Sequence, residues 1–171
     1  MEQKIKSIIA GVTNETLEKL AFFFAFPDDE RDGGVPPPAI TGRVKFSGYF
    51  PGSLAIRLST SSLSELSANM LGLDEDDEIP VQDQQDAFKE MINVICGNTL
   101  PAIAGDHVEF NIGAPEILSE SDVQTEVRKE NCMCVVKLMI DDGFCDVYFF
   151  MEGQLPENIL GKENKQMQQP E

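Results

Sequence analysis

Apolar residues recur with helical spacing in three stretches of the chain. The first covers residues 5–26 and includes a cluster of four phenylalanines just before Pro27, which predicts a deeply packed helix that ends at this proline. Residues 61–71 predict a second, shorter helix, and residues 82–104 predict a third. On the third helix, Phe88 and Ile92 belong to an apolar side that we expect to be buried.

Apolar and polar residues alternate, as in half-buried strands, in five further segments: residues 44–50, 54–58, 108–112, 132–140 and 145–151. Turn residues at Pro51-Gly52 and at Asp142-Gly143 join the first pair and the last pair into predicted hairpins. The order helix, hairpin, helix is then followed by helix, strand, hairpin, which suggests a weak internal duplication. The sequence therefore predicts an α+β fold, an antiparallel-rich sheet with helices packed on one face.

The length of 171 residues fits one compact domain, which we expect to cover residues 1–160. Residues 161–171 are polar and rich in glutamine, and they predict a disordered tail. No apolar run reaches the roughly 18 residues that span a bilayer, and the first residues show no signal-peptide pattern. We therefore expect a cytoplasmic protein.

Charge is the unusual part of the composition. Thirty acidic residues face thirteen basic ones, for a net charge of −17. A field of this sign repels phosphate backbones and anionic lipids, so we expect no nucleic-acid partner and no membrane partner. The acidic runs at 28–32 and 74–78 lack the spacing of a calcium loop and are typical of a solvated surface.

The chain has four cysteines and one histidine, His107, which excludes a multi-histidine metal centre. Cys132 and Cys134 alternate with Met133 in an apolar run, which predicts that the two thiols share a strand face. A zinc site or disulfides are the functional interpretations of these cysteines. The spacing is Cys-x-Cys without a second ligand pair, and the interpretation as free core thiols is favoured; no metal site is predicted.

One polar stripe stands out on the helix predicted for residues 82–104. Asp86, Glu90, Asn93 and Gly97 fall within about 60° of one another on a helical wheel, opposite the apolar side. Asn93 and Gly97 are unfavourable on an exposed helix, glycine by about 1 kcal/mol, and a local cost of this kind points to function. Every amphipathic helix has a polar stripe, however, and a single glycine can have a packing reason, so both interpretations stay open.

The pattern Asp86-x-x-x-Glu90-x-x-Asn93, followed by Gly97-Asn98, resembles the signature of the CheC/CheX/FliY family of chemotaxis phosphatases. The order of predicted elements is similar to that family over about residues 5–155, and the fold implied is CheC/CheX-like. The family signature also includes a proline about two dozen residues after the asparagine.

Pro115 lies 22 positions after Asn93, and the resemblance implies a structural role for it. The first helix carries only an echo of the signature, Asn14-x-x-x-Glu18-x-x-Ala21, in which alanine replaces the asparagine. An alanine cannot orient water. The resemblance is therefore to the single-site, CheX-like members, which typically form homodimers.

The resemblance implies a phosphatase that acts on the aspartyl-phosphate of a CheY-type response regulator. In this interpretation Asn93 orients the attacking water and Glu90 pairs with a lysine of the regulator, while Asp86, Gly97 and Asn98 contact the partner. The Mg²⁺ ion is expected on the regulator, and no cofactor is expected on this chain. Two alternatives stay open: a CheX-like module that binds a receiver domain without catalysis, and an unrelated α+β protein that shares the motif by chance.

Overall fold

The structure is a computed structural model that describes residues 1–31, 37–74, 76–129, 131–141, 143–156 and 159. Helices and strands follow one another as in an α+β protein: α1 (Glu2–Ala21), β1 (Ala25–Pro27), β2 (Ala39–Gly48), β3 (Gly52–Ser59), α2 (Thr60–Leu71), α3 (Val81–Ala104), β4 (Phe110–Ile112), β5 (Glu116–Ile117), α4 (Glu120–Val127), β6 (Cys132–Ile140) and β7 (Gly143–Met151). The predicted tail, residues 161–171, lies outside the described residues.

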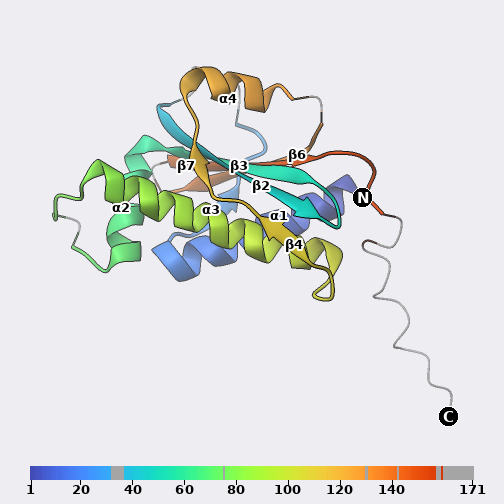
Figure 1. The fold of residues 1–171 in the computed structure, drawn as a ribbon. Helices are drawn as coiled ribbons and strands as arrows, with labels where there is room; N and C mark the ends of the chain where they lie inside the picture. Colours follow the sequence, from blue (N-terminus) through green and yellow to red (C-terminus); the bar gives the residue numbers. More distant parts are fainter. Residues whose placement is uncertain (32–36, 75, 130, 142, 157–158, 160–171) are drawn as a thin grey trace, which may run out of the picture.

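One antiparallel sheet runs through the molecule in the order β1-β6-β7-β3-β2-β4, with β5 also paired to β2. Helices α1, α2 and α3 cover one face of the sheet, as the sequence predicts, and α4 lies over the opposite face (Figure 1). The main core fills the space between the three helices and the sheet, where Leu17, Ile56, Ile92 and Val147 are fully buried. This burial supplies the main driving force for the arrangement.

The internal duplication is visible in the topology. The first half contributes α1, β1 and the hairpin β2-β3, and the second half contributes α3, β4 and the hairpin β6-β7. Each short strand pairs with the hairpin of the other half, since β1 lies beside β6 and β4 lies beside β2. The two halves therefore cannot separate without breaking strand pairs at both edges of the sheet.

The predicted helix over residues 5–26 is wrong at its C-terminal end. Helix α1 ends at Ala21, and Phe22 takes a left-handed conformation (φ 57°) that lets its N–H and that of Phe23 reach carbonyls of the last turn. A helix that ends in this conformation usually has glycine or asparagine there, so the phenylalanine at position 22 did not indicate the end of the helix. The chain then turns into β1, so only Phe23 of the four phenylalanines is buried, while the other three are 58–68% exposed.

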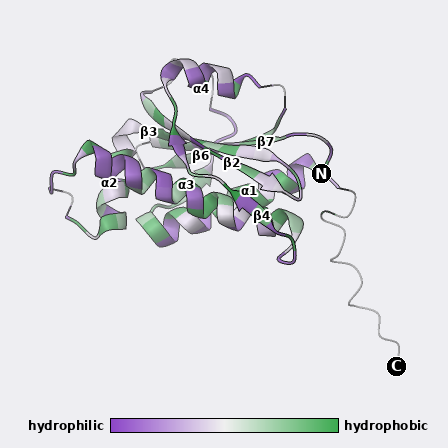
Figure 2. Ribbon diagram, viewed as in Figure 1, coloured by the Kyte–Doolittle hydropathy of each residue, from purple (hydrophilic) through white to green (hydrophobic). Residues whose placement is uncertain are grey.

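Helix α4 and strand β5 were not predicted. Helix α4 spans eight residues and is mostly hydrophilic (Figure 2), so its sequence lacks the apolar periodicity of a buried helix. Its N-terminus is capped by Ser119, whose Oγ accepts a hydrogen bond from the Asp122 N–H. None of the helices that the structure describes is both long and apolar enough to span a bilayer.

Candidate functional site

Helix α3 forms a rigid platform for the polar stripe. Its 24 residues pack against α1, α2 and the sheet, and one side is lined by buried residues: Ala87, Phe88, Met91, Ile92, Ile95, Cys96, Thr99, Leu100 and Ile103. Ile92 and Phe88 of the helix lie against Gly42 of strand β2. A helix held on three sides keeps its exposed side chains at fixed positions relative to one another.

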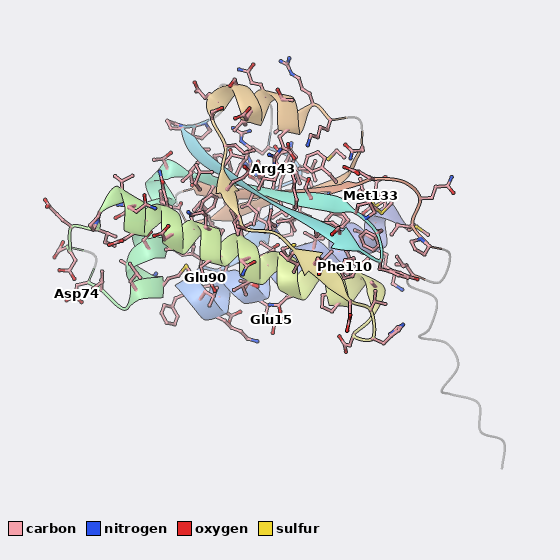
Figure 3. All side chains as sticks on the ribbon, in the orientation of Figure 1. Glu15, Arg43, Asp74, Glu90, Phe110 and Met133 are labelled. Carbon is pink, nitrogen blue, oxygen red and sulfur yellow. The ribbon has the colours of Figure 1, made fainter. Side chains whose placement is uncertain are left out.

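Glu90 and Asn93 are exposed on the outer side of α3 (Figure 3 labels Glu90). Three residues apart on a helix, their Cβ atoms lie about 5–6 Å from each other. Within the described part of the chain, neither side chain has a hydrogen bond or an ion pair. The structure therefore presents a carboxylate and a carboxamide side by side, with all of their hydrogen-bonding capacity available to a partner or to water.

Asp86 lies one turn before Glu90 and is exposed as well. Its Oδ1 accepts a hydrogen bond from Gln82 Nε2 at 3.0 Å and lies 3.3 Å from Lys89 Nζ. The helix begins at Val81, so Asp86 is in its second turn and does not cap it. Because Lys89 partly neutralises Asp86, the carboxylate of Glu90 is the less compensated charge of the stripe.

Gly97 is half-buried, and the space around it is large enough for a side chain. A methyl group at this position would meet only Ile112 Cδ1, at 4.0 Å, which is ordinary van der Waals contact. The internal packing of the described residues therefore does not demand a glycine. Its cost of about 1 kcal/mol in a helix is therefore not explained by contacts within the described residues.

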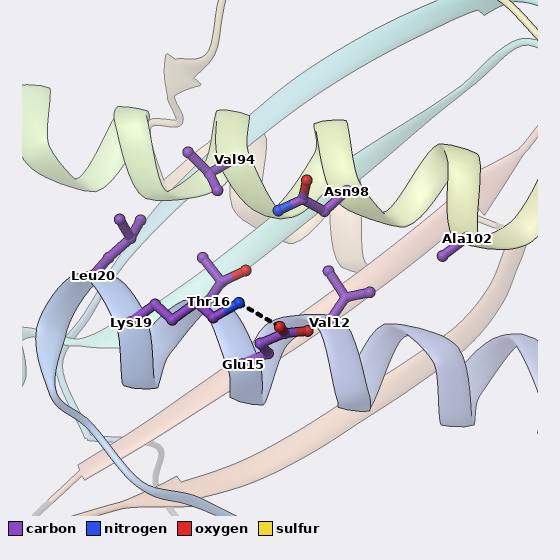
Figure 4. Close-up of a pocket in the computed structure, with 8 residues that line it drawn as sticks. All are labelled: Val12, Glu15, Thr16, Lys19, Leu20, Val94, Asn98 and Ala102. Carbon is purple, nitrogen blue, oxygen red and sulfur yellow. Dashed lines mark hydrogen bonds and ion pairs between the residues drawn. The ribbon is translucent and has the colours of Figure 1, made fainter. Parts of the chain in front are cut away.

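Asn98 lies on a different side of helix α3 from the stripe. It is one residue after Gly97 and so about 100° further round, where it faces α1. There it lines a groove together with Val94 and residues of α1 (Figure 4). The structure thus groups Asp86, Glu90, Asn93 and Gly97, and places Asn98 beside them on another side of the same helix.

Pro115 lies in the segment between β4 and β5, along the edge of the sheet. This segment is tied to β2 by the Gly113 N–H, which donates to the Lys45 carbonyl at 2.8 Å, and by strand β5. The Glu116 carbonyl, one residue after Pro115, lies close to Gly42, the residue on which α3 rests. Pro115 therefore lies in the segment that runs beside α3, between Ile112, which is close to Gly97, and Glu116, which is close to Gly42.

The echo of the signature on α1 has a different environment. Asn14 Oδ1 accepts a hydrogen bond from the Ala25 N–H at 3.3 Å, so this amide joins α1 to β1. Ala21, the counterpart of Asn93, is fully buried and is the last residue of its helix. The position on α1 that corresponds to Asn93 thus holds a buried alanine and presents no carboxamide to solvent.

The four cysteines are free thiols. Burial raises the pKa of Cys96, Cys134 and Cys145 to about 12. The β6-β7 register shifts between Cys132 and Cys134, so the expectation that the two thiols share a strand face stays a prediction. Among the described residues, no group of three or more potential ligands is placed to hold a metal ion.

An ion-pair cluster on the opposite face of the sheet was missed by sequence reasoning. Arg43 of β2 binds Glu116 and also Glu126 of α4, the latter at 2.6 Å, and Lys129 binds Glu126 at 2.8 Å. Glu126 is 1% exposed. These residues are far apart in the sequence, so no local pattern indicates the cluster. The ion pairs of Arg43 connect α4 and the segment that carries Pro115 to strand β2.

The family model described as chemotaxis phosphatase CheX matches residues 40–138 of this chain. Among curated proteins there is no match. Solved structures of similar fold include a chemotaxis protein CheX from Desulfovibrio desulfuricans, with a TM-score of 0.64 and 17% identity over 87% of this chain and 99% of the other. CheX from Vibrio vulnificus gives a TM-score of 0.67 and 16% identity over 89% and 99%.

A third structure of similar fold is a complex of CheX with CheY, BeF₃ and Mg²⁺ from Borrelia burgdorferi. It gives a TM-score of 0.60 and 12% identity over 86% of this chain and 97% of the other. Identities this low establish a shared fold and leave the role of each residue to be argued from the site.

Proposed function

Because the chain belongs to the CheX family of chemotaxis phosphatases, we propose that it hydrolyses the aspartyl-phosphate of a CheY-type response regulator. The observation that carries this proposal is the exposed, unpaired Glu90 and Asn93, one turn apart on a rigidly packed helix. The Borrelia complex, in which CheX is bound to CheY, supports a partner of this kind.

In the proposed reaction the water oxygen attacks phosphorus, the bond from phosphorus to the aspartyl oxygen breaks, and phosphate leaves the regulator. An acyl phosphate is already activated, so the missing element is a water molecule held in line with the scissile bond. The Asn93 carboxamide both donates and accepts hydrogen bonds and can hold that water without a shifted pKa. The Mg²⁺ ion that stabilises charge on the phosphoryl group belongs to the regulator.

Glu90 serves docking in this proposal. Its carboxylate pairs with a lysine beside the phosphorylated aspartate, and this pairing sets the position of Asn93 relative to phosphorus. Asp86 and Gly97 extend the contact along the same stripe, where Gly97 allows the partner's surface to approach the helix backbone. With Ala21 in place of the second asparagine, the proposal includes one active site per chain.

The test measures phosphate release from a phosphorylated CheY-type regulator with and without this protein. We expect the protein to accelerate release and Asn93→Ala to lose about 10²-fold of that acceleration, while Asn131→Ala, an exposed asparagine away from α3, keeps it. Glu90→Gln is expected to raise KM. Binding of the regulator by the wild-type protein without faster release would favour the non-catalytic alternative, and neither binding nor release would overturn the proposal.

We also propose, from the resemblance to CheX-like proteins, that the chain forms a homodimer and works in the cytoplasm, where response regulators are phosphorylated. Light scattering coupled to gel filtration tests the first point. A monomer at micromolar concentration would contradict it.

A further inference from the structure

A groove runs between α1 and α3, directly beside the proposed catalytic stripe. It encloses about 410 Å³ and is lined by Val12, Glu15, Thr16, Lys19 and Leu20 from α1 and by Val94, Asn98 and Ala102 from α3 (Figure 4). Val94 follows Asn93 and Asn98 follows Gly97 in the chain, so a surface that covers the stripe also reaches the groove.

The stripe alone is too small to hold a protein partner. From Asp86 to Gly97 it extends about 16 Å along a helix about 10 Å wide, which corresponds to roughly 160 Å². A specific protein interface covers about 800 Å² on each partner. The partner must therefore contact neighbouring elements, and the groove is a concave surface beside the stripe that carries both apolar and polar side chains.

The chemistry of the groove indicates what it would accept. Val12, Leu20 and Val94 make its apolar walls, and the exposed Asn98 amide has no hydrogen-bond partner within the described residues. At the rim, Glu15 Oε1 lies 2.5 Å from Lys19 Nζ in an exposed ion pair. An exposed pair of this kind is weak and is easily exchanged for another partner.

Acidic side chains predominate around this surface, with Glu15 and Glu18 on α1 and Asp86 and Glu90 on α3, against Lys19 and Lys89. A second copy of this chain would bring the same excess of acid to this contact, and like charges that face each other oppose association at this surface. A partner with basic side chains fits better, because opposite charges favour and orient the encounter.

We propose that the groove between α1 and α3 is the second half of the docking surface for the regulator, and that it receives an apolar side chain of the receiver domain next to a basic one. The basic side chain takes the place of Lys19 beside Glu15, and the apolar one lies between Val12 and Val94. The inference rests on the proposed function, since it assigns the same partner to the groove.

The test uses opposite charge changes at the rim. Glu15→Lys is expected to raise KM for the phosphorylated regulator about three- to tenfold, and Lys19→Glu is expected to lower it, with kcat unchanged in both because Glu90 and Asn93 are untouched. Glu120→Lys on α4 makes the same charge change as Glu15→Lys on the opposite face of the sheet, and should leave KM within about twofold.

A steric variant makes an independent test. Ala102 is exposed at one end of the groove, so Ala102→Trp fills the groove without entering the core. It should weaken binding to a regulator carrying BeF₃ and Mg²⁺, whereas Ser121→Trp on α4 should not. If the wild-type protein is active and these groove variants behave like their controls, the inference is overturned while the proposed function stands. A change in oligomeric state with unchanged KM would also overturn it, and an inactive wild-type protein would contradict the proposed function instead.

Discussion

Ile92 of helix α3 lies directly against Gly42 of strand β2, so that its Cδ1 occupies the space that a side chain at position 42 would need. Phe88 and the Glu116 carbonyl close the same space, at 3.1 and 3.3 Å from the position of a Cβ atom. Helix α3, which carries the proposed site, therefore packs directly on a glycine of the sheet. The absence of a side chain at position 42 determines the distance between the helix and the sheet at this contact.

Gly42→Ala should accordingly destabilise the protein by about 1–3 kcal/mol, because the new methyl group overpacks a closed part of the core. Urea denaturation measures this change. Gly11→Ala is the matched control: nothing lies within 4 Å of its Cβ position, it is inside α1, and we expect it to stabilise by up to about 1 kcal/mol.

Adding Ile92→Val to Gly42→Ala removes the methyl group that causes the clash. The double variant should therefore be more stable than the sum of the two single changes predicts, by about 0.5 kcal/mol or more. If the two changes in the free energy of unfolding simply add, the contact between Ile92 and Gly42 does not determine the distance between helix and sheet.

A substitution at Gly97 should have the opposite effect on stability from one at Gly42, because the Cβ position of Gly97 is open. Gly97→Ala should stabilise α3 by up to about 1 kcal/mol, since alanine is the better helix former and meets only Ile112 at an ordinary distance. The same methyl group should raise KM for the phosphorylated regulator, because it stands where the partner approaches. Thermal unfolding and steady-state kinetics measure the two effects. A stabilised variant with unchanged KM would remove Gly97 from the docking surface.

The elements that carry the candidate site were predictable because their signals are local. The period of apolar residues from Ala87 to Ile103 defines both the buried side of α3 and the stripe of Glu90 and Asn93 opposite. By contrast, α1 ends at the left-handed Phe22, where the chain turns into Ala25–Pro27, and this strand pairs with β6 more than a hundred residues away. Tertiary pairing overrides local preference there, and no spacing in the sequence records it.

The same reason explains why the Arg43 cluster was missed. Arg43, Glu116 and Glu126 come from three elements, two of which, β5 and α4, are too short and too polar to be recognised by periodicity. Only the folded sheet brings these charges together. Nothing in the local sequence around Glu126 indicates that this carboxylate is buried, although it is only 1% exposed.

Glu126 predicts a dependence of stability on pH. Burial alone would raise its pKa, but hydrogen bonds from Lys129 and Arg43, together with their charges, hold the pKa below the usual 4.5. The carboxylate binds fewer protons in the folded state than in the unfolded state, so its contribution is fully present above about pH 4.5 and is lost as the pH falls through the folded pKa.

Glu126→Gln should therefore lower the free energy of unfolding by about 2 kcal/mol at pH 7, because it leaves Arg43 with one charged partner fewer. The difference from wild type should shrink below pH 4.5. Urea denaturation at a series of pH values measures both effects, and Glu120→Gln, exposed on the same helix, is the control. A difference that stays constant with pH would mean that the charge of Glu126 contributes nothing.

The cysteines predict selective chemistry. Cys96, Cys134 and Cys145 are buried, and with a pKa of about 12 only about one thiol in 10⁴ is ionised at pH 8. Cys132 is partly exposed, although burial raises its pKa as well. Iodoacetamide should therefore modify the native protein once, at Cys132, and the urea-unfolded protein four times, as counted by mass spectrometry. Cys132→Ser should leave the native protein unmodified.

Modification at a second cysteine in the native protein would contradict the assignment of the other three residues as core thiols. A mass lower by two hydrogens before treatment would favour a disulfide instead.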